Sequence, residues 1–309
     1  MTIKDVGLEK PISYSGATAW QRFVRKATPY FFISPFFIGF ALFSLLPIAF
    51  SILLSVMKWN GMSAIQFIGL DNFAALFQDP KFWNALKVTF IITLVCTILG
   101  TAGSTFLAVL LEKLNDRLAS GLRVIFFLPA VTSVVVITYI WKQLYSSDYG
   151  YFNALLIRLG LPPQEWLGNP DLALWALIVM LIWAGLGWDA LIITAGLRSI
   201  PQDIYDAGKV DGTGEWSEFR YITLPLLRPT LLFVLVTGVI FLWGIFAQSQ
   251  LLTAGGPLHA TETVALFLYN SGFQYHKFGY ASAIAVVLSI IMAISSYLNI
   301  RFVRYEFEY

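Results

Sequence analysis

Residues 203–229 read DIYDAGKVDGTGEWSEFRYITLPLLRP, and they lie between two of the most apolar runs of the chain. The runs on either side are apolar enough to cross a lipid bilayer. The stretch itself carries charges of both signs, three glycines, and prolines at positions 225 and 229. A structured, amphipathic loop between two membrane spans is suited to contact a soluble partner at the membrane face. These residues therefore predict a membrane protein with a docking loop.

The composition of the chain supports the membrane class. Hydrophobic residues make up 58% of the 309 residues and charged residues only 12%, against about 25% charged residues in a soluble domain. So few charged residues cannot cover the surface of a globular protein, and lipid must therefore be the solvent for much of the chain. The net charge of +2 gives no support for nucleic-acid binding.

The sequence lacks the usual signals of an enzyme or a metalloprotein. Cys96 is the single cysteine and lies in an apolar run, while His259 and His276 are isolated from each other and from any nucleophile. No GxxxxGK[ST] pattern is present, so the chain lacks the loop that binds nucleotide phosphates. We therefore expect no catalytic, metal or cofactor site in this chain.

Six apolar stretches are long enough for transmembrane helices, which need about 20 residues at a rise of 1.5 Å per residue. Each should be helical, because lipid offers no partner to an unpaired backbone amide. They lie near 31–57, 88–111, 124–141, 172–197, 230–252 and 278–300. The predicted fold class is an all-α polytopic membrane protein, with a membrane domain over 31–302, an N-terminal segment over 1–30 and a C-terminal segment over 303–309.

The positions of lysine and arginine predict the orientation of these spans. One side of the membrane would hold six of the 20 basic residues, which are Lys58, Lys81, Lys87, Lys142, Arg158 and Lys277. The remaining 14 (20 − 6) would lie on the side of both termini and of the loop 203–229. Because basic residues concentrate in cytoplasmic loops, both termini and this loop are expected in the cytoplasm.

Polar and aromatic residues inside the spans are candidates for a transport path. Asp189 is charged, and it could line a polar route or pair with a neighbouring subunit. Trp243, Phe246, Ala247 and Gln250 recur at i, i+3, i+4 and i+7, so they share one face if the fifth span is a single helix. Aromatic rings and an amide suit a sugar, with helix packing as the alternative. Tyr297 is the polar member of a similar stripe in the sixth span, where packing is favoured.

Within 203–229 the pattern predicts two short helices. Pro201 suits a first helical turn, and Asp203 and Asp206 favour the positive end of the helix dipole. Gly212 should end this helix, and Thr213 should cap the next. The second helix would carry an aromatic group that a solvated loop would not need, formed by Trp216, Phe219 and Tyr221.

The loop resembles the cytoplasmic EAA loop of ABC importer permeases, in the carbohydrate-uptake, binding-protein-dependent branch of maltose and glycerol-3-phosphate type. That pattern runs roughly EAAxxDGAxxxxxFxxIxLPxLxP, and this chain keeps its spacing from Asp206 to Pro229. Three positions depart from it: Asp206 replaces Glu, and Gly208 and Thr213 each replace Ala. GLDNF at 69–73, LLTAGGP at 251–257 and FGYASAIAVVL at 278–288 resemble further parts of the same family.

The resemblance implies the type I importer fold with cytoplasmic coupling helices, and transport by alternating access in a bacterial or archaeal cell membrane. It implies as partners a second, homologous permease, two copies of an ABC ATPase that uses ATP and Mg²⁺, and an extracytoplasmic binding protein that delivers a sugar. The coupling contact would be made by Asp206, Ala207, Gly208, Asp211, Gly212, Phe219 and Pro225. The substrate path would be lined by Trp243, Phe246, Ala247, Gln250 and Tyr297.

Other functions remain as alternatives. A polyol or glycerol-3-phosphate importer uses the same family, although the stripe in the fifth span has no basic residue for an anion, which favours a neutral sugar. An ion-coupled secondary transporter would be expected to carry more intramembrane charges than Asp189 alone. A membrane scaffold that moves nothing would not need the polar and aromatic stripe.

Overall fold

The computed structural model describes residues 18–303, and the chain divides into two units. The described part of the first unit is one long helix. This unit extends to Leu53 and contains α1 (Ala19–Phe40), η1 (Ala41–Leu45) and most of α2 (Leu46–Ser55). Large apolar side chains such as Phe31, Phe36 and Phe43 are exposed along it. An apolar helix with exposed aromatic side chains is stable in lipid, so Lys26–Ser55 is a candidate membrane span. The expected location of residues 1–17 falls outside the described residues.

The second unit begins at Leu54 and contains the remaining elements. It opens with an antiparallel hairpin of β1 (Met57–Lys58) and β2 (Gln66–Phe67). The elements that follow are α3 (Asp71–Gln78), α4 (Pro80–Val95), η2 (Cys96–Gly100), α5 (Thr101–Lys113), α6 (Asp116–Val131), α7 (Val134–Leu144), α8 (Tyr151–Arg158), α9 (Pro170–Arg198), α10 (Gln202–Val210), α11 (Glu215–Glu218), η3 (Phe219–Thr223), α12 (Leu224–Leu226), α13 (Arg228–Trp243), α14 (Ala247–Thr253), α15 (Val264–Tyr269), η4 (Asn270–Gln274) and α16 (Phe278–Val303).

The long helices of the second unit are the membrane spans. Residues Pro80–Lys113 form one helix of 34 residues through α4, η2 and α5, and α9 has 29 residues. With α16 and the helix of the first unit, four helices among residues 18–303 are long and apolar enough to cross a membrane. Two bent helix pairs raise the total to six if each pair is one span. The C-terminal segment predicted over 303–309 lies outside the described residues after residue 303.

The third predicted span, 124–141, is not one helix. It is divided between α6 and α7, whose axes differ by 105°. Thr132 and Ser133 between them are extended, with ψ of 143° and 134°. Pro129 has no amide hydrogen to donate to the preceding turn, so the helix ends soon after it. The Thr132 hydroxyl donates to the carbonyl of Leu128 at 2.7 Å and satisfies one of the last free acceptors.

The fifth predicted span, 230–252, is also interrupted. It consists of α13 and α14 with a break over residues 244–246, so the prediction of a single helix is wrong. Gly244 closes α13 through its amide, which donates to the carbonyls of Ile240 and Phe241. Phe246 then takes φ −130° and ψ −60°, which is not helical. The chain therefore leaves the helix over residues 244–246 before α14 begins.

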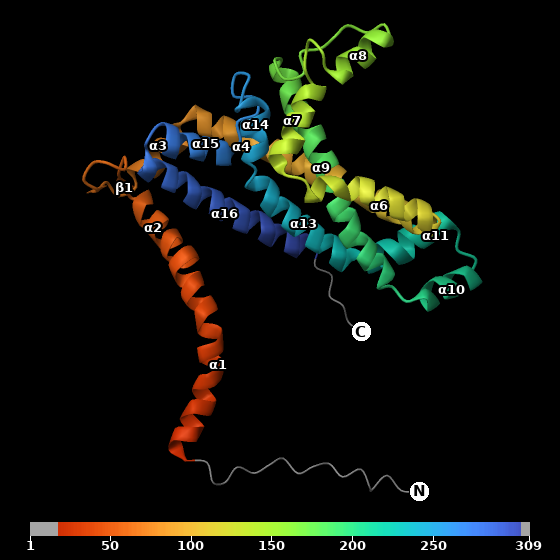
Figure 1. Ribbon diagram of the computed structural model, residues 1–309, viewed down its shortest axis with the longest axis horizontal. Coiled ribbons are helices and arrows are strands. Elements are labelled where there is room, and N and C mark those ends of the chain that lie inside the picture. Colours follow the sequence, from red (N-terminus) through yellow and green to blue (C-terminus); the bar gives the residue numbers. More distant parts are fainter. Residues whose placement is uncertain (1–17, 304–309) are drawn as a thin grey trace. The chain divides into compact units, whose positions relative to one another are not determined.

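Helix α9 lies at the centre of the second unit and packs against both α5 and α6, while α13 packs along α16 (Figure 1). Buried apolar residues of α9 such as Leu177, Met180 and Ile193 form the middle of two of the core clusters. At one end of α16 lie the hairpin and α3. Helices α10 and α11 lie beyond the start of α13, toward the other end of α16 (Figure 1).

The contact between α6 and α9 depends on Gly187. A Cβ atom at this position would lie 1.9 Å from the carbonyl oxygen of Phe126, which means that the two helix backbones touch. Such close approach through small residues is a common way to pack helices in lipid, where apolar burial gives little driving force. Gly185, two residues earlier, has open space around its missing Cβ.

We predict that Gly187→Ala destabilises the membrane domain by about 3 kcal/mol, because a backbone carbonyl cannot move aside as a side chain can. The thermal unfolding of the detergent-solubilised chain measures this effect. Gly185→Ala on the same helix is the matched control and should unfold at or slightly above the temperature of the unaltered chain, because alanine is the better helix former. Equal unfolding temperatures for the two variants would contradict the proposed backbone contact.

Candidate functional site

The loop predicted to dock a partner contains two helical segments, as expected from its sequence. The first is α10, and the second runs without a break through α11, η3 and α12. A bend of 65° then leads into α13. Pro201 is the N-cap of α10, so the helix begins one residue after the position predicted for its first turn.

Gly212 ends α10 with a Schellman motif, as its sequence context predicts. Its φ is +79°, and its amide donates to the carbonyl of Lys209 at 3.0 Å. The amide of Thr213 donates to the carbonyl of Gly208, also at 3.0 Å. These two bonds satisfy the last carbonyls of α10, and only glycine adopts a positive φ without steric cost.

Thr213 does not cap the second helix, so that prediction is wrong. Gly214 is the N-cap of α11, and the buried hydroxyl of Thr213 has no hydrogen-bond partner among the described residues. Instead, this hydroxyl would lie 3.1 Å from a Cβ atom at position 208. Gly208 is buried, and such a Cβ atom would lie still closer, 2.7 Å, to Cδ1 of Ile222, so the glycine makes room for both Thr213 and Ile222. Two of the three departures from the EAA pattern, Gly208 and Thr213 in place of Ala, therefore lie next to each other in the structure.

Most of the residues assigned to the coupling contact are exposed on this loop. Asp206, Ala207, Asp211 and Gly212 are accessible, whereas Gly208 is buried and Phe219 and Pro225 are half-buried. Asp206 is held from within its own helix, because Lys209 lies 3.4 Å and Gln202 Nε2 lies 3.3 Å from its Oδ1. Large apolar side chains are exposed beside these residues, with Val210 88%, Trp216 73% and Tyr221 74% accessible.

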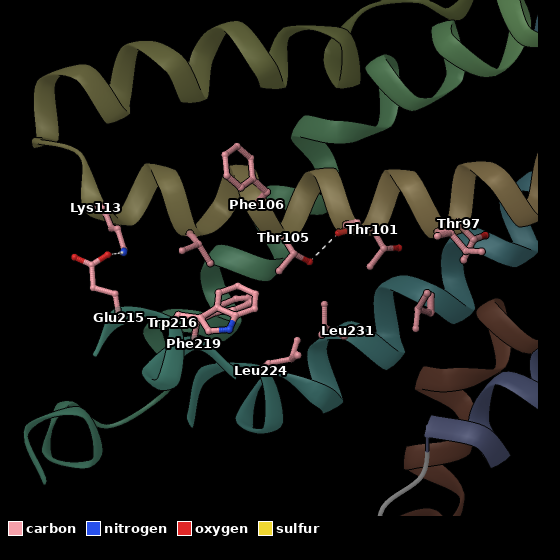
Figure 2. Close-up of a pocket in the computed structure, with 14 residues that line it drawn as sticks. Thr97, Thr101, Thr105, Phe106, Lys113, Glu215, Trp216, Phe219, Leu224 and Leu231 are labelled. Atoms are coloured by element: carbon pink, nitrogen blue, oxygen red, sulfur yellow. Dashed lines mark hydrogen bonds and ion pairs between the residues drawn. The ribbon is translucent and has the colours of Figure 1, made fainter. Parts of the chain in front are cut away.

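An exposed apolar surface on a polar loop indicates a protein partner. Ion pairs join both ends of this surface to the membrane helices. Glu112 accepts hydrogen bonds from Arg198 at 3.0 Å and from Arg123 at 2.9 Å, which joins α5 to α9 and α6. The next residue, Lys113, bonds Glu215 at 2.6 Å and joins α5 to α11 (Figure 2). This hydrogen bond and the lysine charge lower the pKa of the Glu215 carboxyl.

The C-terminal end of α5 is therefore bonded to the chain both before and after α10. Arg198 directly precedes the loop, and Glu215 follows the turn after α10. A further bond, 3.2 Å between the hydroxyls of Tyr205 and Thr223, joins α10 to η3. These contacts join the loop to α5, α6 and α9. We call the pairs Glu112–Arg198 and Lys113–Glu215 the α5 clasp.

A groove of about 760 Å³ lies beside the clasp, between α5 and α13 (Figure 2). Thr97, Thr101 and Thr105 form one wall at successive helical turns, and Lys113 and Glu215 lie at one end. The rings of Trp216 and Phe219, with centroids 5.7 Å apart, cover that end. Its lining is otherwise apolar, as expected for a surface at membrane depth.

The residues predicted to line the substrate path do not share one helix face. Trp243 is buried in the core at the end of α13, whereas Ala247 and Gln250 lie on α14 beyond the break. Phe246 lies in the break itself, with its ring 4.7 Å from that of Tyr269. Tyr297 is exposed on α16. The face predicted for a straight helix is therefore wrong in its geometry, and the role of each residue stays a prediction.

Asp189, which was a candidate by its charge alone, lies next to an aromatic pair of α9 and α6 that was not predicted. Trp188 is 53% accessible and stacks on Phe127 with ring centroids 6.2 Å apart. Asp189 follows it and makes no hydrogen bond or ion pair with the part of the chain that the structure describes. The signal was present as the neighbouring pair Trp188–Asp189 inside an apolar run, but only the packing of α6 on α9 shows that Phe127 joins them.

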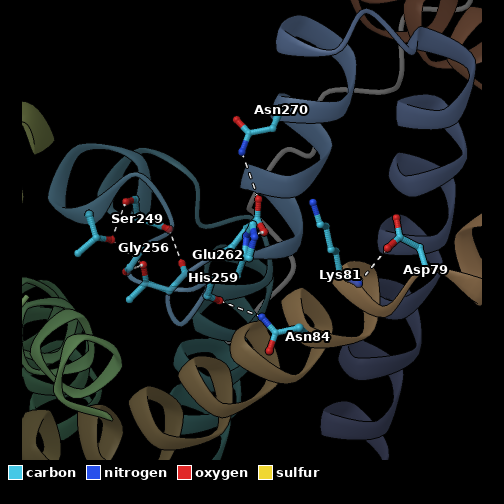
Figure 3. Close-up of polar contacts among 10 residues, drawn as sticks. Asp79, Lys81, Asn84, Ser249, Gly256, His259, Glu262 and Asn270 are labelled. Carbon is cyan, nitrogen blue, oxygen red and sulfur yellow. Dashed lines mark hydrogen bonds and ion pairs between the residues drawn. The ribbon is translucent and has the colours of Figure 1, made fainter. Parts of the chain in front are cut away.

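The loop after α14 is held rigid by a polar network (Figure 3). Glu262 is buried, and its two oxygens contact His259 Nδ1 at 2.7 Å and Asn270 Nδ2 at 3.2 Å. Asn84 on α4 donates to the carbonyl of His259 at 2.9 Å. These bonds give the LLTAGGP region and its continuation a structural role, because they join α4, the loop and η4.

Comparison with known proteins identifies the family of this chain. The model described as binding-protein-dependent transport system inner membrane component matches residues 104–304, which is more than half of the chain. The chain belongs to this family. The matched region includes most of α5, the clasp and the whole loop 203–229, so the resemblance found in the sequence is confirmed.

Two relatives of the permease extend the match over most of the chain. The probable ABC transporter permease protein YesP of Bacillus subtilis (strain 168) is 37% identical over 91% of this chain and 93% of its own length. The lactose transport system permease protein LacF of Rhizobium radiobacter is 32% identical over 87% of this chain and 91% of its own.

A solved structure confirms the predicted fold class. A bacterial ABC transporter involved in the import of the acidic polysaccharide alginate contains a chain that superposes with a TM-score of 0.81 at 24% identity. The superposition covers 92% of the permease and 99% of that chain. The permease therefore has the all-α type I ABC importer fold, a multi-pass fold of the inner membrane.

We predict that Gly208 and Thr213 are energetically coupled. Alanine in a helix interior is favoured over glycine by about 1 kcal/mol, but at position 208 its Cβ would crowd both Ile222 and Thr213, and only the second contact is relieved by Thr213→Ala. Gly208→Ala should therefore be at least about 0.5 kcal/mol more favourable when Thr213→Ala is also present. Hydrogen exchange of the α10 amides measures the four members of this cycle. Additive effects of the two substitutions would contradict the contact.

Proposed function

We propose that the permease is the membrane subunit of an ATP-driven importer that brings a sugar into the cell. The loop 203–229 docks a cytoplasmic ABC ATPase, which binds ATP and Mg²⁺ and carries out the hydrolysis. The permease itself is not an enzyme in this proposal. The observation that carries it is the exposed surface of α10 and α11, which is apolar and acidic and is clasped to three membrane helices.

The arrangement of the clasp suggests how ATPase movement reaches the membrane. When two ATPase copies close, they displace α10, and the displacement passes through Arg198 to Glu112 and through Glu215 to Lys113. Two such contacts on adjacent residues of α5 make the loop and the helices move together. Helices α5, α6 and α9 then rock as one group and alternate the side on which the substrate path opens.

The remaining partners follow from the same proposal. A second, homologous permease completes the path, and an extracytoplasmic solute-binding protein delivers the substrate at the face opposite the loop 203–229. Both termini and this loop lie in the cytoplasm, as the distribution of 14 against six basic residues indicates. The expected location is the inner membrane of a bacterial or archaeal cell.

We propose a sugar as the substrate, in keeping with the lactose system of the relative LacF. Candidate contacts are Phe246, Gln250 and Tyr297, together with the stacked pair Trp188 and Phe127. The argument for a neutral sugar depended on a single face of the fifth span, and the break at Gly244 removes it. A polyol or glycerol-3-phosphate substrate remains the alternative within the same proposal.

Uptake in whole cells and membrane extraction test this function. ATP depletion should abolish sugar uptake, whereas an uncoupler of the proton gradient should leave it intact. The chain extracted in mild detergent should carry an ATPase and a second six-span protein. Asp206→Arg, which reverses a charge on the docking surface, should lose the ATPase while the permease stays in the membrane. Uptake by the isolated chain under an ion gradient would refute an ATP-driven importer.

A second prediction concerns the turn after α10. A side chain at Gly212 must adopt a left-handed conformation, which costs about 1–2 kcal/mol, so Gly212→Val should weaken association with the ATPase about tenfold. Gly214→Thr is the control of matched size, because Gly214 has φ −80° and open space around its missing Cβ, and threonine is accepted at an N-cap. Co-purification of the ATPase at graded concentrations compares the two. Equal association would contradict a docking role for this turn.

A further inference from the structure

A second cavity lies at the end of α16 that is remote from the loop 203–229. It has a volume of about 610 Å³ and opens between the β1–β2 hairpin, α3 and the first turn of α16. We call it the outer pocket. Its size falls in the range of about 300–1,000 Å³ that is typical of small-ligand sites. In the proposed function, the outer pocket lies on the face of the membrane opposite the ATPase.

The walls of the outer pocket are fixed by hydrogen bonds. Asn72 on α3 donates through Nδ2 to the carbonyls of Ser55 and Met57, both at 2.9 Å. The amide of Gly279 faces the carbonyl of Trp59 at 3.4 Å. A Cβ atom at position 279 would lie 1.9 Å from the carbonyl oxygen of Met57, so the first turn of α16 touches the hairpin backbone. The pocket is therefore preformed.

The lining of the outer pocket carries more positive than negative charge, with two lysines and one aspartate. Lys58 and Lys277 line it, and neither makes an ion pair among residues 18–303. Asp79 is the carboxylate of the lining, and its two oxygens already accept hydrogen bonds, from the amide of Lys81 at 2.9 Å and from the hydroxyl of Tyr280 at 2.9 Å (Figure 3 shows the first). Asp79 stays negative, but neither lysine forms an ion pair with it, so two ammonium groups face one carboxylate and a net positive charge is left for an anion.

The other lining groups suit a sugar ring. Trp59 and Tyr280 provide aromatic surface, and the ring of Trp59 is held by Phe278 with centroids 5.4 Å apart. Asn72 uses only its Nδ2 group in the bonds to Ser55 and Met57, which leaves its Oδ1 as an acceptor for a hydroxyl. His276, exposed at the rim, adds a further polar group. Aromatic faces, an amide and ammonium groups together match a sugar that carries a carboxylate.

We propose that the outer pocket binds an acidic sugar through its carboxylate, with Lys58 and Lys277 as the cationic partners and Trp59 and Tyr280 as the ring contacts. This proposal deepens the proposed function, on which it depends, by assigning a uronic acid-containing saccharide as the substrate class. The pocket would receive one end of the saccharide before it enters the membrane path. The cations would thereby select acidic saccharides over neutral ones of equal size.

Interfacial lysine and aromatic residues also bind lipid phosphate groups, so the test must separate two sources of the anion. The permease is assembled with its partner permease and ATPase, without the binding protein, in phosphatidylcholine nanodiscs. Calorimetric titration with digalacturonate and with the neutral disaccharide galactobiose compares the two sugars. A parallel set of nanodiscs that contain phosphatidylglycerol measures retained lipid by mass spectrometry.

We expect digalacturonate to bind at least about tenfold more tightly than galactobiose, since a charge-assisted hydrogen bond is absent in the neutral sugar. Lys58→Gln and Lys277→Gln should each weaken digalacturonate binding about tenfold, whereas Lys58→Arg and Lys277→Arg should retain most of it. Lys142→Gln, an exposed lysine on α7 outside the pocket, is the matched control and should bind as the unaltered chain does.

Equal affinity for the two sugars, no binding of digalacturonate, or binding that is unaffected in the double glutamine variant would overturn the proposal. Phosphatidylglycerol that is retained by the unaltered chain and lost from the double variant, without digalacturonate binding, would assign the pocket to lipid and also overturn it. ATP-dependent uptake of a neutral sugar by the double variant would leave the importer function standing while the acidic substrate class failed.

Discussion

The structure depends on the need of every backbone amide and carbonyl to find a partner within the chain, because lipid supplies none. This constraint makes the spans helical, and it also governs the places where they break. At the break after α13, the carbonyl of Ile245 has left the helical pattern, and the hydroxyl of Thr263 donates to it at 2.7 Å. The amide of Val264 in turn donates to the hydroxyl of Thr89 at 2.9 Å. Threonine side chains thus replace the missing helical bonds and hold the break in one conformation.

The same logic explains how a polar loop can be joined firmly to membrane helices. Glu112 and Lys113 lie at the end of α5, at the depth where a helix leaves the lipid and charged groups can meet water. Pairs at such a boundary contribute little to stability when they are exposed. Their value here is geometric, since Arg198 binds Glu112 through two nitrogens and fixes the direction of approach of α9. The loop is therefore positioned by the spans as well as by its own internal contacts.

The two faces of the membrane domain carry different chemistry. On the side of the loop 203–229, exposed apolar residues such as Trp216 and Tyr221 accompany acidic ones, which suits a protein surface. At the other end, the outer pocket is small, preformed and cationic, which suits a small anion. Each face thus has a surface matched to a different kind of partner.

The sequence by itself determined the membrane class, the positions of the long helices, the turn at Gly212 and the family. These features depend on composition, apolar length and local backbone conformation, all of which act between near neighbours in the chain. Only the tertiary structure decided that the third and fifth spans break, that Gly208 makes room for Thr213, and that Phe127 stacks on Trp188. It also brought Lys58 and Lys277 to one pocket, although 219 positions (277 − 58) separate them in the chain. Such contacts depend on how distant helices pack, because packing and not local preference determines which backbone groups lose a helical partner and gain another.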